Sequence, residues 1–371
     1  MKIIVSGGGT GGHIYPALTI IRTIQAQRPD AEFLYVGTHA GLEADIIPKE
    51  NLPFATVDIQ GFRRQLTLDN LRRAGRAMVG VGKAMRIVRD FHPDVAVGTG
   101  GYVCGPILLA ASLAHVPTLI QEQNVVPGIT NKLLAHFVSK IAVGMPEAGK
   151  HFPEAKVVDT GNPIRQEVMT AERAAGAQAF GFDPAKTTVL ISGGSRGARA
   201  INRAMVPLLA EAARHPEVQM LLVTGKGEYD DIMARLRDAG VDLAQTPHLQ
   251  VRPYLYNMPQ AQAMADLAVF RAGATGLAEL TARGIPAILI PYPYAAENHQ
   301  EHNAQALVDA GAARMILNRD LTAKTLGSML TELLSQPEKL KQMAAASRQL
   351  GRPQAAQTIA DLVLALAEQR Q

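Results

Sequence analysis

The sequence contains almost no cysteine and shows no secretory leader. Cys104 is the single cysteine among 371 residues, which excludes a disulfide framework and favours a reducing compartment. The N-terminus leads directly into the first expected strand, without the charged, apolar and cleavage regions of a signal peptide. We therefore expect a cytoplasmic protein.

Charge is absent from residues 95–120, which contain no Asp, Glu, Lys or Arg. A run of this length could span a membrane. Glycines and prolines interrupt it at Gly98, Gly100, Gly101, Gly105, Pro106 and Pro117. The pattern favours a strand, a glycine-rich turn, a buried helix and a second strand over a membrane span.

Short apolar runs alternate with helical patterns along the whole chain. The expected strands are 3–5, 32–36, 55–59, 94–97, 117–120, 140–143, 188–191, 219–223, 249–251, 267–270, 287–290 and 313–316. Helical patterns between them include 16–27, 129–138, 200–213 and 277–282. Such alternation predicts an α/β protein with doubly wound parallel sheets, and twelve strands are too many for one small sheet.

An internal sequence similarity supports two similar domains. Residues 3–12 and 189–198 each consist of an apolar strand, a Ser-Gly-Gly turn and a helix start. Two Rossmann-like halves would open in this way, with their turns facing a shared cleft. We expect an N-terminal domain over 1–162 and a C-terminal domain over 163–351, with a last helix over 352–371 that could pack on either half.

The first glycine loop, Gly-Gly-Gly-Thr-Gly-Gly-His at 7–13, is typical of an anion site at a helix N-terminus. Alone it satisfies G-x-G-x-x-G, which is weak evidence for a dinucleotide site. The strand after it ends Tyr-Val-Gly-Thr at 35–38, without the carboxylate that would hold a ribose. No G-x-x-x-x-G-K-[ST] is present, which excludes a P-loop nucleotidase.

Further polar and glycine-rich segments follow other expected strands. In the first half they are 98–102 and 121–124, and in the second half 193–197, 271–279 and 297–300. Parallel strands bring such segments to one sheet edge, where ligands bind. Glu279, one turn into a helix, could accept hydrogen bonds from two ribose hydroxyls.

A basic segment with interleaved apolar residues covers 62–89, and its single acid is Asp69. Its cations are Arg63, Arg64, Arg72, Arg73, Arg76, Lys83, Arg86 and Arg89. An amphipathic basic helix suits an anionic membrane surface, and an ordinary helix with a solvated basic face is the alternative. No recognised nucleic-acid-binding motif accompanies this segment, so we expect no nucleic acid partner.

Taken together, these motifs resemble glycosyltransferase family 28. The resemblance rests on 7–13, Gly-Thr-Gly-Gly-Tyr-Val at 98–103, Gln-Glu-Gln-Asn at 121–124, Gly-Asn-Pro-Ile-Arg at 161–165, Gly-Gly-Ser at 193–195 and 273–279. The members it resembles are the membrane-associated N-acetylglucosaminyltransferases of peptidoglycan synthesis, which have the GT-B fold. It implies a peripheral enzyme on the cytoplasmic face of the cell membrane, with lipid I and UDP-N-acetylglucosamine as substrates. Other cell-wall synthesis proteins are further expected partners, and no cofactor is implied.

The resemblance also assigns site residues. Those implied to contact UDP-N-acetylglucosamine are Thr10, Gly11, Gly12, Asn124, Arg165, Ser195, Leu255, Ala274, Thr275, Gly276, Leu277, Ala278, Glu279 and Gln300. His13, Tyr102, Glu122 and Asn131 are implied on the acceptor side. Two positions depart from the family pattern: Gly276 replaces a common threonine, and Glu297-Asn298 replaces an acidic pair.

The implied reaction inverts the anomeric carbon and needs a base for the acceptor hydroxyl. We predict His13 for that role, because imidazole titrates near working pH, with Glu122 as the alternative. No Asp-x-Asp occurs, so we predict no essential metal held by that motif. A UDP-N-acetylglucosamine 2-epimerase, a dinucleotide-dependent oxidoreductase and a membrane-surface nucleotide-sugar sensor are the competing interpretations.

Overall fold

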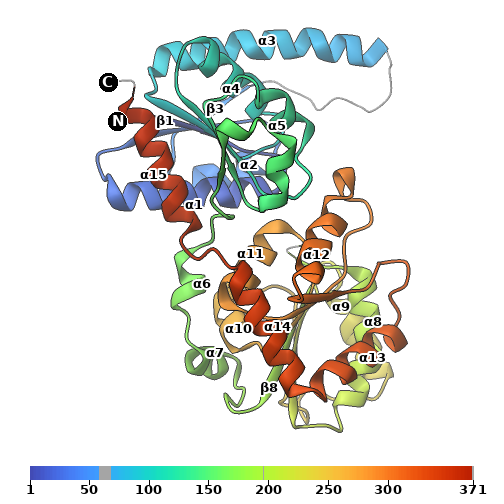
Figure 1. Cartoon of the computed structure of the whole chain (residues 1–371). Coiled ribbons are helices and arrows are strands. Elements are labelled where there is room, and N and C mark those ends of the chain that lie inside the picture. The colour runs from blue at the N-terminus through green and yellow to red at the C-terminus, as the bar shows by residue number, and fades with distance from the viewer. Residues whose placement is uncertain (58–67, 195, 370–371) are drawn as a thin grey trace. The chain divides into compact units, whose positions relative to one another are not determined.

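The chain divides into two compact units, each with its own parallel sheet. The computed structural model describes residues 1–57, 68–194 and 196–369, with the backbone alone for 68–79. Unit 1 comprises Met1–Ile164 and Gln354–Gln371, and unit 2 comprises Arg165–Pro353. Figure 1 shows the elements of both units.

Unit 1 contains a sheet of seven strands in the described part of the chain, in the order β3-β2-β1-β4-β5-β6-β7. The strands are β1 (Lys2–Ser6), β2 (Glu32–Gly37), β3 (Phe54–Thr56), β4 (Val95–Gly98), β5 (Thr118–Glu122), β6 (Lys140–Val143) and β7 (Val157–Asp159). The helices are α1 (Gly11–Gln27), α2 (Leu42–Ile46), α3 (Leu68–Phe91), α4 (Cys104–Leu113), α5 (Ile129–Leu134) and α15 (Ala355–Glu368). Short 3-10 helices cover Ile47–Glu50, Pro146–His151 and Glu154–Lys156.

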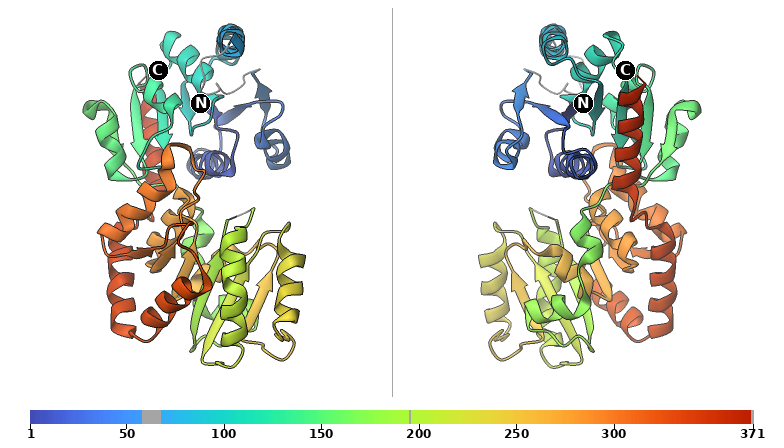
Figure 2. Two further views of the ribbon diagram at one scale, coloured as in Figure 1. Left: turned by 90° about the vertical axis from the view of Figure 1, so that its right-hand side faces the viewer. Right: turned by 90° about the vertical axis from the view of Figure 1, so that its left-hand side faces the viewer.

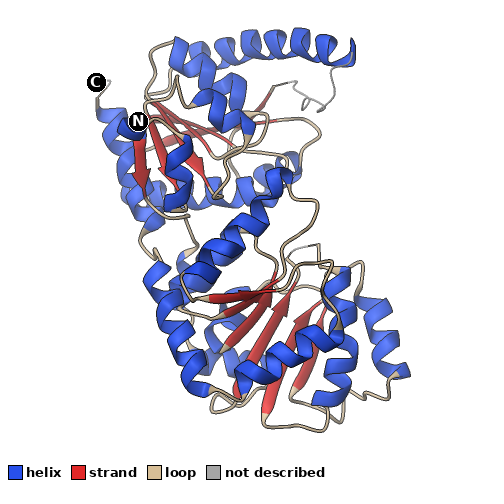
Figure 3. Cartoon of the chain, turned by 45° about the vertical axis from the view of Figure 1, so that its right-hand side comes forward, coloured by secondary structure: helices blue, strands red, loops and turns tan. Residues whose placement is uncertain are grey.

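Unit 2 repeats this plan with six described strands in the order β10-β9-β8-β11-β12-β13. They are β8 (Thr187–Ser192), β9 (Val218–Val223), β10 (Leu249–Arg252), β11 (Leu267–Phe270), β12 (Ala287–Leu289) and β13 (Ala313–Met315). Its helices are α6 (Gln166–Thr170), α7 (Arg173–Phe180), α8 (Arg199–Ala212), α9 (Tyr229–Asp238), α10 (Met258–Met264), α11 (Ala274–Arg283), α12 (His299–Asp309), α13 (Ala323–Leu334) and α14 (Pro337–Leu350), with a 3-10 turn at Ala296–Asn298. Figure 3 shows helices on both faces of this sheet.

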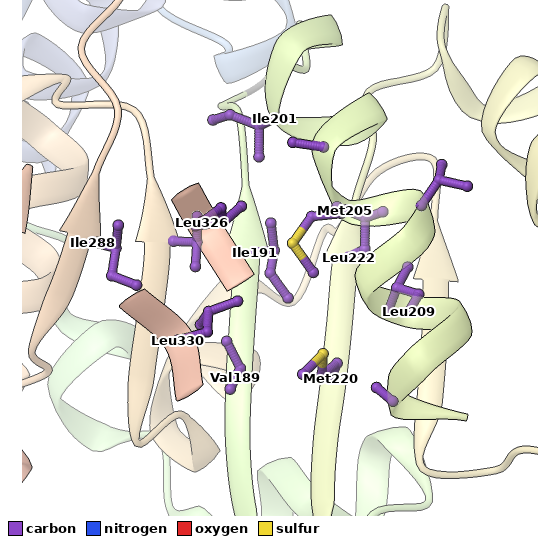
Figure 4. Close-up of a cluster of buried hydrophobic side chains, with 14 of the residues drawn as sticks. Val189, Ile191, Ile201, Met205, Leu209, Met220, Leu222, Ile288, Leu326 and Leu330 are labelled. Carbon is purple, nitrogen blue, oxygen red and sulfur yellow. The ribbon is translucent and has the colours of Figure 1, made fainter. Parts of the chain in front are cut away.

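The buried apolar runs of the sequence form the sheets and their cores. In unit 2, Val189 and Ile191 of β8 pack with Met205 of α8 and Leu326 of α13, and all four side chains are fully buried (Figure 4). Each fully buried apolar side chain contributes roughly 1.5–3 kcal/mol. Strand β1 has the same central place in unit 1 as β8 in unit 2, so the similar segments 3–12 and 189–198 contain equivalent strands.

The segment at 95–120 forms β4, α4 and β5, as its glycine and proline pattern predicts. Within the described ranges, no helix is both long and apolar enough to cross a membrane.

Several predicted boundaries were wrong. Helix α1 begins at Gly11 rather than at residue 16, because Pro16 is accommodated inside the helix. The third strand covers Phe54–Thr56 instead of 55–59, whose last two residues lie outside the described ranges, and α5 ends at Leu134 instead of 138. The short strand β7 was missed.

The last helix packs on unit 1. Ile359 and Val363 of α15 are fully buried in one apolar cluster with Ile14 and Ile21 of α1 and Leu119 of β5. Figures 1 and 2 show α15 in red beside α1 in blue. The sequence did not decide on which half this helix packs.

Candidate active site

The first glycine loop leads from the central strand β1 into α1. Thr10 is the N-cap residue, with extended φ of −142°, and Gly11, Gly12 and His13 are the first three residues of the helix. The His13 N–H donates to the Thr10 carbonyl at 3.1 Å. The earlier N–H groups of a helix have no intrahelical acceptor, and they carry the positive end of the helix dipole. The loop therefore offers backbone donors to an anion, with His13 beside them.

Buried Glu43 connects this loop to the end of β2 through hydrogen bonds. Its Oε2 accepts a hydrogen bond from the Gly9 N–H at 2.9 Å. Its Oε1 accepts from the N–H and the hydroxyl of Thr38 at 3.0 and 2.7 Å. Burial alone raises the pKa of Glu43, but these hydrogen bonds together outweigh it and hold the pKa below its ordinary value. Glu43 was not predicted from the sequence, because an acid was expected only at the end of the strand, as a ribose ligand.

Replacing Glu43 by Gln is expected to lower the free energy of unfolding near neutral pH by about 1–3 kcal/mol, because an NH2 group then faces an N–H donor. The folded pKa lies below the unfolded value, so the carboxylate stabilises the fold above the unfolded pKa. That contribution is lost as the pH falls through the folded pKa. The variant should therefore lose less stability on acidification than the native chain, as measured by urea unfolding from about pH 7 down to about pH 3.

Glu338→Gln is the matched control, since Glu338 lies on α14 with 80% of its side chain exposed. Equal acid sensitivity in Glu43→Gln and in the native chain would contradict this role for Glu43.

The turn after β4 packs directly against the first loop. The Gly8 N–H donates to the Gly100 carbonyl at 3.2 Å. Gly101 has φ of +87°, and a Cβ there would lie 2.5 Å from the Gly8 carbonyl oxygen, so this close approach requires glycine. Strands β1 and β4 are neighbours at the point where the chain order of the sheet reverses, the usual ligand position in such folds. Tyr102 follows in the same turn and is 57% exposed.

His13 contacts the buried side-chain amide of Gln123 at this junction. Its Nδ1 is 3.0 Å from Oε1 of Gln123, and its ring is partly exposed. The Thr99 hydroxyl donates to the His13 carbonyl at 2.7 Å. The imidazole is thus held between the loops that follow β1, β4 and β5.

Glu122, at the end of β5, anchors the loop that follows it. Its Oε1 accepts from the N–H and side-chain amide of Asn124 at 3.0 and 3.3 Å. Its Oε2 accepts from the Gly128 N–H at 3.2 Å and from the side-chain amide of Asn131 at 2.8 Å. Glu122 is 2% exposed, so a substrate hydroxyl would have to displace one of these donors to reach it.

In unit 2, the turns after β8 and β9 pack against each other. Gly197 has φ of +75°, and a Cβ there would lie 1.9 Å from the Thr224 carbonyl oxygen. Residues 193–194 lie in the turn after β8, which leads into α8. Ser195 lies outside the described residues, and its predicted contact stays a prediction.

Glu279 projects from the second turn of α11 and is held on both oxygens. Arg165 Nη2 lies 3.2 Å from Oε1, and the side-chain amide of Gln262 donates to Oε2 at 2.8 Å. Glu279 is 7% exposed. Arg165 also lines a cavity of about 520 Å³ with Glu167, Tyr256 and Gln260. Gln262 was not predicted from the sequence, because it belongs to none of its motifs.

The remaining residues of unit 2 that are predicted to contact UDP-N-acetylglucosamine follow the strands β10, β11 and β12. Gly273 is the N-cap of α11, whose first residues are Ala274, Thr275, Gly276, Leu277 and Ala278. A Cβ at Gly273 would lie 4.0 Å from Nε2 of Gln300, whose Oε1 accepts from the Tyr292 N–H at 3.0 Å. Leu255 is buried in the loop after β10.

Both departures from the family pattern have a structural context. A Cβ at Gly276 would have Phe270 Cδ2 as its nearest neighbour, at 3.8 Å, which is an ordinary van der Waals contact. Asn298 has φ of +52°, in the left-handed region that asparagine tolerates better than most residues. Its side-chain amide donates to Glu301 at 2.7 Å.

Comparison with known proteins decides the family. The glycosyltransferase family 28 N-terminal domain matches residues 3–143, and the family 28 C-terminal domain matches residues 188–359. The chain belongs to glycosyltransferase family 28. It is therefore an enzyme that transfers a sugar, as the motifs predicted.

Close relatives of this family 28 chain share one name, UDP-N-acetylglucosamine–N-acetylmuramyl-(pentapeptide) pyrophosphoryl-undecaprenol N-acetylglucosamine transferase. The protein from Moorella thermoacetica is 47% identical over 369 residues, covering 99% of this chain and 100% of the relative. The protein from Bacillus cytotoxicus is 47% identical over 363 residues, covering 98% of each chain.

Solved structures confirm the predicted GT-B fold. MurG of Acinetobacter baumannii is 30% identical with a TM-score of 0.77, and the match covers 98% of this chain and 99% of that one. UDP-GlcNAc 2-epimerase of Neisseria meningitidis has a TM-score of 0.68 at 14% identity, covering 98% of this chain and 100% of that one. The second likeness shows a shared fold alone. The family match therefore favours the transferase over the epimerase that the sequence left open.

Proposed function

We propose that this enzyme transfers N-acetylglucosamine from UDP-N-acetylglucosamine to the C4 hydroxyl of the N-acetylmuramoyl sugar of lipid I, giving lipid II. The observation that carries this proposal is 47% identity, over nearly the whole chain, to transferases named for this donor and this acceptor.

The predicted residues of the two units have different roles in the proposed reaction. In unit 1, His13 takes the proton from the acceptor hydroxyl, with Tyr102 and Asn131 on the acceptor side. Two observations favour His13 over Glu122 as the base: His13 is partly exposed, whereas both oxygens of Glu122 already accept hydrogen bonds inside the protein. A base must come within hydrogen-bond reach of the proton that it takes.

In unit 2, Glu279 accepts hydrogen bonds from the ribose hydroxyls, and Gln300 binds the donor sugar. Arg165 and Gln262 support the first role, because they fix the direction of the Glu279 carboxylate. The leaving UDP gains negative charge, which the N–H groups of the glycine turns stabilise. Independence from a protein-bound metal stays a prediction, and loss of turnover with a chelator, restored by magnesium, would contradict it.

A transfer assay tests the reaction. The enzyme is incubated with UDP-N-acetylglucosamine labelled in the sugar and with a lipid I analogue, and the lipid fraction is counted. Label in that fraction is the expected result. Label in free epimerised sugar nucleotide would instead indicate the epimerase, and no transfer under any condition would contradict the proposal.

We further propose that unit 1 binds an anionic membrane surface on the cytoplasmic side. The described end of α3 exposes Lys83, Arg86 and Arg89. Helix α4 packs against both α3 and α5, and this region exposes Leu113, Leu133 and Phe137 by 56–66%. Basic and apolar side chains on neighbouring helices suit anionic headgroups and the acyl boundary. Arg63 and Arg64 lie outside the described residues, as do the side chains of the cations at 72, 73 and 76.

Arg86→Glu/Arg89→Glu is expected to weaken binding to vesicles containing phosphatidylglycerol at least tenfold, since each basic residue near such a surface contributes about 1 kcal/mol. Co-sedimentation measures the bound fraction, and added salt should weaken native binding. Arg237→Glu/Arg319→Glu makes the same charge change on exposed positions of unit 2 and is expected to bind normally. Equal loss in both pairs would contradict a surface on unit 1.

A further inference from the structure

Gln123 has a fixed amide orientation beneath His13. Its Nε2 donates to the backbone carbonyl of Thr99 at 2.7 Å and to that of Gln121 at 3.1 Å. A carbonyl oxygen accepts and cannot donate, so the atom facing these two groups is the NH2 group. Oε1 of Gln123 must then face Nδ1 of His13.

This orientation determines which ring nitrogen of His13 carries the proton. Oε1 of Gln123 can accept but cannot donate, and it lies 3.0 Å from Nδ1. The hydrogen bond therefore requires a proton on Nδ1. Neutral His13 then has an unprotonated Nε2, because neutral imidazole carries one ring proton.

A closed circuit of buried amides keeps Gln123 in place. The NH2 group of Gln123 also contacts Oε1 of Gln121. Gln121 Nε2 donates to Asn162 Oδ1 at 2.9 Å, and Asn162 Nδ2 donates back to the Gln123 carbonyl at 2.9 Å. All three residues are at most 4% exposed. Reversal of any one amide would break hydrogen bonds in a site without water access, so the circuit has one favoured direction.

We propose that Gln123 is a positioning residue for the transfer reaction. It holds the His13 ring and keeps its proton on Nδ1, so that Nε2 is free to act as the base. This inference rests on the proposed function of His13. In the step, the acceptor C4 oxygen forms a bond to the anomeric carbon and gives its proton to Nε2. The bond from the anomeric carbon to the diphosphate breaks, and its electron pair leaves with UDP.

The first test observes the proton and needs no substrate. Enzyme labelled with ¹⁵N-histidine is studied by long-range proton–nitrogen correlation NMR, and the His13 signals are assigned by their loss in His13→Ala. We expect a protonated Nδ1 and an unprotonated Nε2 in the native enzyme above neutral pH. We expect both tautomers in Gln123→Met, which has similar volume but no acceptor. A native His13 protonated on Nε2 would overturn the proposal.

The second test measures turnover. Gln123→Met is expected to lower kcat about 10- to 100-fold through misplacement of the base. Its affinity for UDP, measured by calorimetry, should change little, because the proposed ribose contact at Glu279 lies in unit 2. Gln357→Met, at an exposed position of α15, is the matched control. A folded Gln123→Met enzyme with native kcat would overturn the proposal.

Gln123→Asn covers the case in which Gln123→Met fails to fold. It keeps a side-chain amide, but its shorter side chain moves the acceptor oxygen away from Nδ1 of His13. We expect both His13 tautomers and a lowered kcat in this variant. The native tautomer together with native kcat in Gln123→Asn would overturn the proposal, as would a native enzyme protonated on Nε2, which is observed without any variant.

Failure of the inference differs from failure of the proposed function. If His13→Ala turns over normally while native His13 carries its proton on Nδ1, the base assignment fails and the amide circuit stands. If His13→Ala is inactive while native His13 is protonated on Nε2, the base stands and the role of Gln123 fails.

Discussion

His13→Ala is expected to lower kcat about 10²- to 10⁴-fold, the usual contribution of a positioned general base. The alanine leaves the acceptor hydroxyl without a group to take its proton, while the glycine loop keeps its backbone donors. Steady-state transfer to a lipid I analogue measures the loss, and UDP affinity measured by calorimetry should be unchanged.

His215→Ala is the control, because His215 is an exposed histidine of unit 2 paired with Glu217. Near-native turnover by His13→Ala would place the base elsewhere. Glu122→Gln is then the variant to compare: the structure predicts a loss of stability for it, because an NH2 group would face the donors from the 124–131 loop.

Glu279→Ala is expected to weaken UDP binding about 10- to 1,000-fold. Hydrogen bonds to a charged acceptor contribute about 1.5–3 kcal/mol each, and the variant also leaves Arg165 and Gln262 without their shared partner. Titration calorimetry with UDP alone measures the change and needs no acceptor. The KM for UDP-N-acetylglucosamine should rise in parallel.

Glu279→Gln keeps the size of the side chain and one acceptor oxygen, so its loss should be smaller than that of Glu279→Ala. Glu217→Ala, an exposed carboxylate of the same unit, is expected to bind UDP normally. Native UDP affinity in Glu279→Ala would contradict a ribose contact at this residue.

Local patterns predicted the elements of the fold well where one physical signal dominated. Strands 140–143 and 267–270 coincide with β6 and β11, because short apolar runs form buried strands: β11 is buried throughout, and β6 is buried after Lys140. Strand β7 at Val157–Asp159 was missed because it is short, lies at a sheet edge and is partly exposed. The helical pattern over 16–27 began too late, because Pro16 normally marks a helix boundary and here lies inside α1. The glycine loop at 7–13 predicted the helix N-terminus correctly, since His13 lies in the first turn of α1.

The candidate site shows the same limit more clearly. The glycine turns and the polar residues at strand ends follow from spacing, since parallel strands bring their carboxyl ends to one edge. The partners that hold them do not. Gln123 lies 110 positions from His13, and Gln262 lies 17 positions from Glu279. Which amide meets which side chain depends on sheet order and loop path, and no local pattern in the sequence encodes either.

The packing of α15 on unit 1 has a consequence for synthesis of the chain. The apolar cluster around Ile14 and Ile21 is completed by Ile359 and Val363, which are made after the whole of unit 2. A nascent chain ending at residue 353 contains all of unit 2 but leaves this face of unit 1 uncovered. Unit 1 is therefore discontinuous in the chain, and its core cannot be completed until α15 has been made after unit 2.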